Sequence, residues 1–351
     1  MKKILAVFLL VFLLAACGDD TKSNDGHSEE KPSVSEKSKK TATDDKEADQ
    51  MDDENNESEE IALPTTELQK LDEGEEIRNL QQALEKIGYN IPIDGVYSDL
   101  TVWAVTDFQM QTDDLYITGV YDSDTRKAIE QLLMEEETVE AGKALAPPAE
   151  PVFTGSGSLV VSNPYEQLVV INKEHALPED FEPMDLIVPD VRFPFAEDDP
   201  KKQMRAPAAQ ALEELFRAAE EEGHYLFAQS GYRSYQRQAF LFENYSAKHG
   251  EEEANKFSAR PGESEHQTGL TMDITSEAVN YQLTVDFGNT PEGKWVAENA
   301  HKFGFIIRYP EGKEDITKYQ YEPWHLRYVG VRAATEMKEN DLTLEEYFSL
   351  D

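Results

Sequence analysis

The feature that most limits what this chain can fold into is a stretch of 45 residues, 18–62, that contains no aromatic side chain. It carries 16 acidic and 6 basic side chains. Such a composition cannot bury enough apolar surface to offset the entropy of ordering a chain. We therefore expect residues 18–62 to form a disordered acidic tether, spanning roughly 35–40 Å on average. The folded domains are expected in the residues that follow this tether.

Charge and cysteine content narrow the function classes further. The chain has 33 Lys and Arg against 71 Asp and Glu, a formal net charge of −38. This balance excludes an electrostatic nucleic-acid binder, because such proteins neutralise phosphates with Lys and Arg. The single cysteine, Cys17, excludes an intramolecular disulfide and any multi-cysteine metal site. A metal bound by this chain must therefore sit on His, Asp or Glu.

Residues 1–17 have the pattern of an export signal. Lys2 and Lys3 are followed by an uncharged apolar run, 4–14, which suits a signal peptide and is short for a transmembrane helix. The run ends in Leu14-Ala15-Ala16-Cys17, which resembles the lipobox of bacterial lipoproteins. That resemblance implies a lipid anchor on Cys17. It also implies an extracytoplasmic protein tethered to the cell membrane and facing the cell wall. Nothing else in the sequence is expected to span a bilayer.

Residues 63–135 are predicted to form a three-helix bundle. Apolar residues recur at helical spacing from residue 75 to Gly88, and again over 101–110 and 124–133, with an Asp94-Gly95 turn after the first helix. The stretches LQQALEKIGY, DGVYSDLTVWAVTDFQ and TGVYDSDTRKAIEQL resemble the peptidoglycan-binding domain of bacterial cell-wall hydrolases. The resemblance implies a bundle that holds wall polymer; a bundle that acts only as a spacer is the alternative.

The remainder divides into a linker and one larger domain. Residues 136–158 contain three prolines and two glycines toward their end and are read as a linker. Residues 159–351 mix predicted helices and strands without regular βαβ alternation, which indicates an α+β domain. The expected helices are 207–222, 235–248 and 294–302, and the expected strands are 168–171, 270–274 and 324–329.

Two of the seven histidines lie where chemistry is expected. His266 precedes the strand 270–274, in which Asp273 shares the polar face. His325 follows Glu322-Pro323-Trp324, and the proline keeps Glu322 out of helical conformation. Two His and one Asp are a suitable ligand set for catalytic zinc, and a nearby Glu is a candidate general base. Spacing alone leaves chance occurrence open, because both patterns are short.

Four longer stretches carry a resemblance to a known family. LVVINKEHALPEDFEPMDL, SGYRSYQRQ, ARPGESEHQTGLTMDI and YEPWHLRYVG look like the VanY-type zinc D-alanyl-D-alanine carboxypeptidases, a family that also includes LD-carboxypeptidases. The resemblance implies a small antiparallel sheet with flanking helices that binds one zinc ion. The implied zinc ligands are His266, Asp273 and His325. Glu322 is the implied catalytic base, and Arg233 is implied to contact the substrate.

Three further residues are expected to shape the substrate pocket: Ser264, Gln229 and Trp324. Whether Arg233 binds the terminal carboxylate or the developing oxyanion stays open, as does its role as a plain structural ion pair. Trp324 could equally be a core residue.

The sequence is therefore interpreted as a lipid-anchored wall enzyme that trims the terminal D-alanine of peptidoglycan stem peptides. One alternative is an LD-carboxypeptidase acting on tetrapeptide stems. Another is a non-catalytic peptidoglycan-binding protein, which Glu322 disfavours because a pure binder needs no base.

Overall fold

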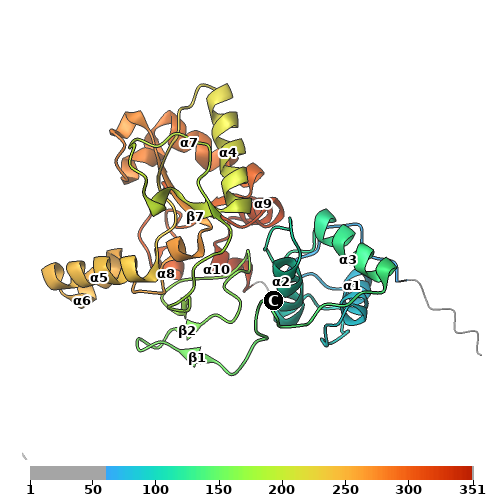
Figure 1. Ribbon diagram of the computed structural model, residues 1–351. Helices are drawn as coiled ribbons and strands as arrows, with labels where there is room; N and C mark the ends of the chain where they lie inside the picture. Colours follow the sequence, from blue (N-terminus) through green and yellow to red (C-terminus); the bar gives the residue numbers. More distant parts are fainter. Residues whose placement is uncertain (1–60, 350–351) are drawn as a thin grey trace, which may run out of the picture. The chain divides into compact units, whose positions relative to one another are not determined.

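The computed structural model (Figure 1) describes residues 61–349. The predicted signal peptide, Cys17 and nearly all of the predicted tether lie outside the described residues. Within 61–349, no helix is both long and apolar enough to cross a membrane. The helices are α1 (Glu75–Lys86), α2 (Asp99–Gln111), α3 (Ser123–Glu135), α4 (Ala206–Glu221), α5 (Tyr235–His249), α6 (Glu251–Phe257), α7 (Pro291–Asn299), α8 (Glu314–Thr317), α9 (Val331–Asn340) and α10 (Leu344–Tyr347).

The strands are short and form three small sheets. Two of the sheets are β1-β2-β3 and β4-β5, and the third has four strands in the order β6-β7-β9-β8. All neighbouring strands in the four-stranded sheet are antiparallel. An antiparallel sheet with flanking helices, preceded by a helical region, confirms the predicted α+β class. The strands are β1 (Val152–Phe153), β2 (Leu159–Val160), β3 (His175–Ala176), β4 (Leu186–Ile187), β5 (Met204–Arg205), β6 (Phe227–Ser230), β7 (Thr271–Thr275), β8 (Phe305–Ile307) and β9 (His325–Tyr328).

The three helices of the N-terminal bundle lie where the sequence predicts them, within two or three residues at each end. Their apolar faces meet in one core, which includes Leu80, Leu84 and Phe108. Asp122 begins α3 by accepting hydrogen bonds from the backbone N–H groups of the first turn. Gly88 follows α1 at φ +119°, and a Cβ there would lie 2.6 Å from a backbone oxygen. Glycine is therefore required at this helix end.

Part of the segment predicted as a linker, 136–158, packs onto the bundle. The buried carboxylate of Asp107 accepts hydrogen bonds from the backbone N–H groups of Gly142, Ala144 and Leu145 at 2.7–3.0 Å. Trp103 donates its indole N–H to the Leu145 carbonyl. Further along, β1 pairs antiparallel with β2. The segment is thus held by specific bonds near both of its ends.

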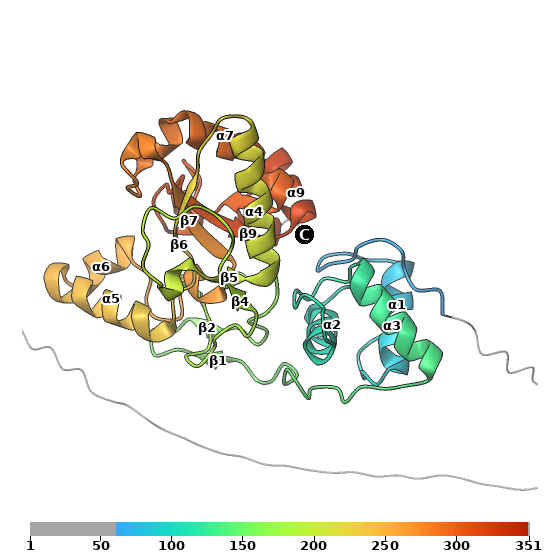
Figure 2. The ribbon, with the colours of Figure 1, turned by 45° about the horizontal axis from the view of Figure 1, so that its top comes forward.

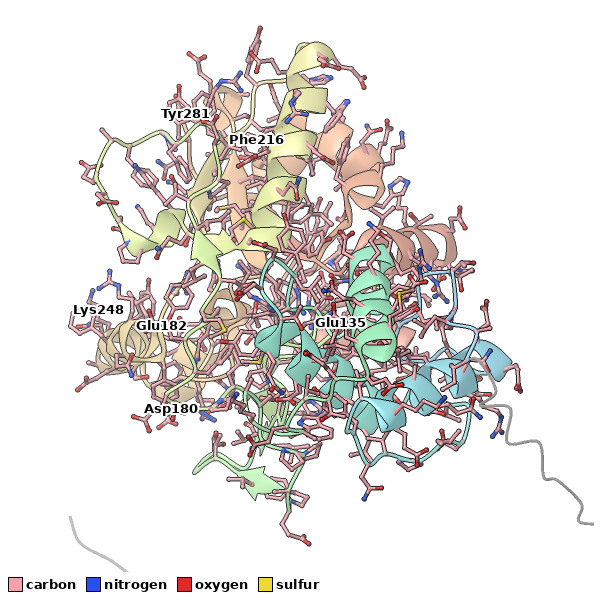
Figure 3. The ribbon with its side chains drawn as sticks, turned by 45° about the vertical axis from the view of Figure 1, so that its right-hand side comes forward. Glu135, Asp180, Glu182, Phe216, Lys248 and Tyr281 are labelled. Atoms are coloured by element: carbon pink, nitrogen blue, oxygen red, sulfur yellow. The ribbon has the colours of Figure 1, made fainter. Side chains whose placement is uncertain are left out.

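The four-stranded sheet carries the main core of the second half of the chain. Apolar side chains of α4 and α7 pack with alternate residues of β7, such as Met272 and Ile274. Figure 3 shows Phe216 on the side of α4 next to the sheet. In Figures 1 and 2, α5 and α6 lie side by side and extend away from the sheet. The other face of β7 is left to polar residues, among them Asp273.

Two predicted elements differ from the structure. Residues 168–171 are not a strand. Instead, the backbone carbonyls of Gln167 and Val169 accept hydrogen bonds from the buried Arg327 guanidinium, so a side chain takes the place of a neighbouring strand. The helix predicted at 294–302 begins earlier, at Pro291, because Thr290 caps it. It gives way to a 3₁₀ turn at Ala300.

Candidate active site

Strand register brings the first two candidate residues together. In the pairing of β7 with β9, Asp273 and His325 are direct partners. On the other edge of β7, Asp273 pairs with Ser230 of β6, next to a register shift between Ala228 and Ser230. Side chains of partnered residues point to the same face of a sheet. The carboxylate of Asp273 and the imidazole of His325 therefore share one face.

His266 reaches the same place from a 3₁₀ turn, Glu265–Thr268. Gly269 ends this turn at φ +70° and leads into β7. The Nδ1 atom of His266 lies 2.8 Å from the carbonyl oxygen of Gly231. A Cβ on Gly231 would lie 2.3 Å from the Gln203 carbonyl oxygen. Only glycine therefore lets this backbone pack against Lys201 and Gln203, in the position from which its carbonyl holds the His266 ring.

The three candidate ligands converge on one point. One ligand atom from each of His266, Asp273 and His325 can be chosen so that all lie within 4.8 Å of one another. His266 Nε2 lies 3.4 Å from an Asp273 carboxylate oxygen, and His325 Nδ1 lies 3.0 Å from the other. The three residues are 6%, 4% and 3% exposed, respectively. This is a compact, nearly dry cluster of two nitrogens and a carboxylate.

In each imidazole ring, the nitrogen that points away from the cluster contacts another residue. His266 directs Nδ1 to the Gly231 carbonyl, so that nitrogen carries the proton and Nε2 presents a lone pair to the cluster. His325 has its Nε2 atom 3.4 Å from Glu265 Oε2, which leaves Nδ1 facing Asp273. Histidine ligands of metals are commonly oriented by such outer contacts.

The pKa values of the three candidate ligands shift for different reasons. Burial, followed by the nearby Arg233 charge, lowers the pKa of His266 to about 3, so its ring is neutral at pH 7. Burial opposes ionisation of Asp273, but the two histidines outweigh it and hold the pKa of this carboxyl below its usual range. For His325, burial is outweighed by Asp273 and Glu265, which raise the pKa to about 9. A cation at this point is stabilised by the same carboxylates.

Glu322 lies beside the cluster without joining it. One of its carboxylate oxygens is 3.7 Å from His325 Nδ1, and its side chain is 16% exposed. Burial, aided by the Asp273 charge, raises the pKa of Glu322 to about 7. A carboxylate with a pKa near neutrality can both accept and return a proton, which is what a general base needs.

The donor set fits a zinc ion. Asp273 Oδ1 is buried and has no hydrogen-bond partner among the described residues, although His325 Nδ1 is 3.0 Å away. An orphaned buried oxygen is costly unless a ligand satisfies it. Two imidazole nitrogens and one carboxylate form a three-ligand set that catalytic zinc sites use while keeping a position for water or substrate. His266, Asp273 and His325 could therefore hold zinc.

A small cavity of about 220 Å³ opens onto the cluster. It is smaller than the roughly 300–1,000 Å³ pockets that hold drug-sized ligands, which suits the end of a peptide. Arg233 lines it and is braced by Gln238, whose Oε1 accepts a 2.9 Å bond from the guanidinium. Gln238 in turn donates to the Ala259 carbonyl. The arginine is therefore a fixed positive charge in the cavity wall.

The remaining predicted pocket residues divide into two groups. Ser264 and Trp324 line the cavity, and Trp324 is also part of the main core. Gln229 is not among the lining residues; its amide lies 3.4 Å from the Tyr281 carbonyl instead. The register shift in β6 after Ala228 brings Ser230, and not Gln229, opposite Asp273.

Sequence reasoning missed several lining residues: Gln238, Glu265, Tyr309 and Tyr319. Gln238 lies in the same motif as Arg233, SGYRSYQRQ, and Glu265 lies in the same motif as His266, ARPGESEHQTGLTMDI. These shared motifs could have indicated that both residues belong to the pocket. The two tyrosines had no such signal. Their tilted rings contact each other with centroids 4.7 Å apart, and the ring of Tyr309 lies tilted against that of His325 with centroids 4.8 Å apart.

Two family models match this sequence. Residues 201–331 match VanY, described as D-alanyl-D-alanine carboxypeptidase. Residues 73–129 match the family described as "Putative peptidoglycan binding domain". The first range contains every candidate residue of the cavity named above, and the second lies within the N-terminal bundle.

Similar proteins include two curated bacterial relatives. The chain is 48% identical over 239 residues to "Putative carboxypeptidase YodJ" of Bacillus subtilis (strain 168), covering 66% of this chain and 88% of the relative. It is 34% identical over 229 residues to a D-alanyl-D-alanine carboxypeptidase of Enterococcus faecalis (strain ATCC 700802 / V583), covering 58% and 80% respectively.

Among solved structures, the chain is similar to the LdcB LD-carboxypeptidase. The TM-score is 0.55 and the sequence identity is 54%, covering 56% of this chain and 92% of that one. The LdcB structure is described as revealing the molecular basis of peptidoglycan recognition.

Proposed function

The chain belongs to the VanY family of D-alanyl-D-alanine carboxypeptidases, and we propose that it uses one zinc ion to remove the C-terminal D-alanine from peptidoglycan stem peptides. The observation that carries this proposal is the convergence of His266, Asp273 and His325 beside a carboxylate that is not one of the three. A metal site with an adjacent base can activate water for hydrolysis.

The chemistry follows from the positions of the side chains. Zinc, when bound, supplies Lewis acidity that activates water and polarises the scissile carbonyl. Glu322 accepts a proton from the attacking water, whose oxygen forms the new bond to the carbonyl carbon. When the C–N bond breaks, Glu322 returns that proton to the departing amine. A pKa near 7 suits both transfers.

Arg233 is proposed to bind negative charge on the substrate. A guanidinium has five N–H donors, and the bonds to Gln238 and Ser230 use only some of them. The others can engage a terminal carboxylate or a developing oxyanion. Because a carboxypeptidase must recognise a chain end, a fixed cation in a small cavity favours the carboxylate.

A second candidate function is supported by a specific observation. Identity to the LD-carboxypeptidase structure is 54%, against 34% to the relative named as a D-alanyl-D-alanine carboxypeptidase. Both activities release D-alanine and differ in the residue before the cut. An LD-carboxypeptidase acting on tetrapeptide stems would use the same metal site, base and arginine.

Stem peptides of defined length test the proposed function. We expect the purified protein without its signal segment to shorten a pentapeptide ending in D-alanyl-D-alanine by one alanine, as measured by mass spectrometry. A tetrapeptide ending in D-alanine serves as the parallel substrate for the LD alternative. Loss of alanine only from the tetrapeptide would replace the first candidate with the second.

The matched control is a pentapeptide ending in L-alanine, which has the same mass and charge. It should remain intact because the cavity must distinguish the configuration of the last residue. If neither D-terminated peptide is shortened by zinc-loaded protein, the proposed function is wrong.

The N-terminal half is proposed to deliver the enzyme to its substrate. The peptidoglycan-binding family match over 73–129 supports a bundle that holds wall polymer. A lipid anchor on Cys17 followed by an acidic tether would keep the enzyme on the outer side of the membrane. The domain arrangement proposed is signal 1–17, tether 18–62, bundle 63–135, linker 136–158 and peptidase domain 159–351.

Substitution of Cys17 tests the anchor. In the Cys17→Ala variant, we expect the protein to be released into the medium or to stay unprocessed, because the chain has no other cysteine to carry the lipid. Membrane fractionation and intact mass of the mature protein measure this. An unchanged mass with unchanged membrane association would exclude lipidation at Cys17.

A further inference from the structure

We infer that Glu265 is a positioning residue that fixes the ring orientation and tautomer of His325, so that Nδ1 of this histidine faces the metal. The inference deepens the proposed function and rests on the zinc site proposed there. Glu265 is completely buried and directly precedes the candidate ligand His266, yet it is not one of the three converging residues. Its contacts point to a different task.

The two carboxylate oxygens of Glu265 have separate partners. Oε1 accepts 2.7 Å bonds from Arg308 Nε and from Arg327 Nη1. Oε2 is left to face His325 Nε2 at 3.4 Å, with the Thr271 hydroxyl at 3.5 Å. Because both guanidinium groups hold Oε1, the carboxylate cannot rotate freely. Its second oxygen is therefore kept beside the imidazole.

The arginines are themselves locked in place. Arg308 donates its two terminal nitrogens to the two oxygens of Glu345, at 2.8 and 2.6 Å. Arg327 donates to the Gln167 and Val169 carbonyls. Arg308, Arg327 and Glu265 have no exposed side-chain surface, and Glu345 is 17% exposed. Charge-assisted bonds in such a dry environment hold their geometry strongly.

The guanidinium groups of this network are already matched by its carboxylates. Two guanidinium groups face two carboxylates, Glu265 and Glu345, so the four side chains sum to zero. A neutral imidazole with its proton on Nε2 can donate to Glu265 and still offer the Nδ1 lone pair to a cation. A carboxylate only accepts hydrogen bonds. It therefore selects the tautomer that a metal at Nδ1 requires.

An amide at this position would select the opposite tautomer. In Glu265→Gln, the amide oxygen can still accept from both arginines, which directs the NH₂ group toward His325 Nε2. That nitrogen must then act as an acceptor, so the proton moves to Nδ1 and blocks the metal. The substitution keeps the size of the side chain while reversing its hydrogen-bonding character on the side of His325.

Zinc affinity of the full chain, measured by competition with a chromophoric chelator, tests this inference. We expect Glu265→Gln to bind zinc about 10- to 100-fold more weakly, the usual cost of losing a partner of a metal ligand. The matched control is Glu345→Gln, which removes the same charge from the same network without touching His325. Glu345→Gln should lower the melting temperature and weaken zinc binding much less than Glu265→Gln does, because Glu345 acts on His325 only through Arg308 and Glu265.

A measurement on the unsubstituted protein keeps the inference testable even if Glu265→Gln does not fold. Long-range ¹H–¹⁵N spectra of the zinc-loaded protein should show His325 with its proton on Nε2. A proton on Nδ1, zinc affinity of Glu265→Gln equal to that of the unsubstituted protein, or an equal loss in Glu345→Gln would each overturn the inference. Failure of the unsubstituted protein to bind zinc would instead refute the proposed function.

Discussion

Replacing Glu322 with glutamine is expected to lower kcat on the stem peptide by about 10²- to 10⁴-fold, the usual contribution of a general base. The variant should keep its fold, its zinc and most of its substrate affinity. Glutamine has the same size as glutamate but cannot take a proton from water. Because Glu322 lies 3.7 Å from His325 Nδ1 and outside the three-residue cluster, its loss should not release the metal.

The pH profile provides a second signature of the same base. With its pKa raised to about 7 by burial, Glu322 is protonated in acid and cannot accept a proton. The kcat/KM value should therefore fall in acid, below the pH at which Glu322 ionises in the active enzyme. A bound cation would stabilise the carboxylate, so it would move this acid limb to lower pH. The limb should be absent from the residual activity of Glu322→Gln.

Glu314→Gln is the matched control, since Glu314 is an exposed acid that begins α8. Steady-state kinetics, metal content and substrate affinity should be measured on both variants side by side. If Glu322→Gln retains kcat within a few-fold of the unsubstituted enzyme, Glu322 is not the base. If it loses zinc as well as turnover, Glu322 is a ligand.

Removal of the metal is the second large effect. Chelation should abolish hydrolysis and added Zn²⁺ should restore it, with about one metal per chain as expected for a single three-ligand site. Zinc should also stabilise the fold, by about 2.7 kcal/mol when free zinc is 100 times Kd. Activity, metal analysis and thermal melting measure these three outcomes. Full activity after exhaustive chelation would require a mechanism without metal.

His325→Ala should behave like the metal-free enzyme, even when zinc is supplied. The variant loses one of three ligands, so both zinc content and turnover should be lost, whereas Glu322→Gln loses turnover alone. His249→Ala is the control, because His249 is exposed at the end of α5 and is not part of the cluster. Stoichiometric zinc in His325→Ala would remove this histidine from the ligand set.

Much of the fold could be predicted from sequence because helices are defined by local spacing. The three bundle helices and α4, α5 and α7 all lie where apolar residues recur every three or four positions. A capping residue can also define where a helix begins: the Asp122 side chain accepts hydrogen bonds from the first turn of α3. Where a cap was overlooked, at Thr290, the predicted start of α7 was late by three residues.

The three candidate metal ligands could also be proposed from the sequence, but through motifs and not through geometry. Residues 266, 273, 322 and 325 carry the recognisable pattern, and the structure brings the three candidate ligands within 4.8 Å. Gln229, which was predicted to shape the pocket, does not line the cavity. The sequence does not reveal the register shift in β6 that places Ser230 opposite Asp273 instead. Gln238 occupies the cavity wall beside Arg233 instead.

By itself, the sequence determined which residues could do chemistry and which segments could be helical, because both depend on residue types within one or two turns. Only the tertiary structure decided how those residues meet. The pairing of Asp273 with His325 depends on the register of two strands. The buried partners of Glu265 come from β9 and from Arg308, the residue that follows β8. Such contacts join distant segments, and their geometry is set by packing and buried charge, which no local pattern records.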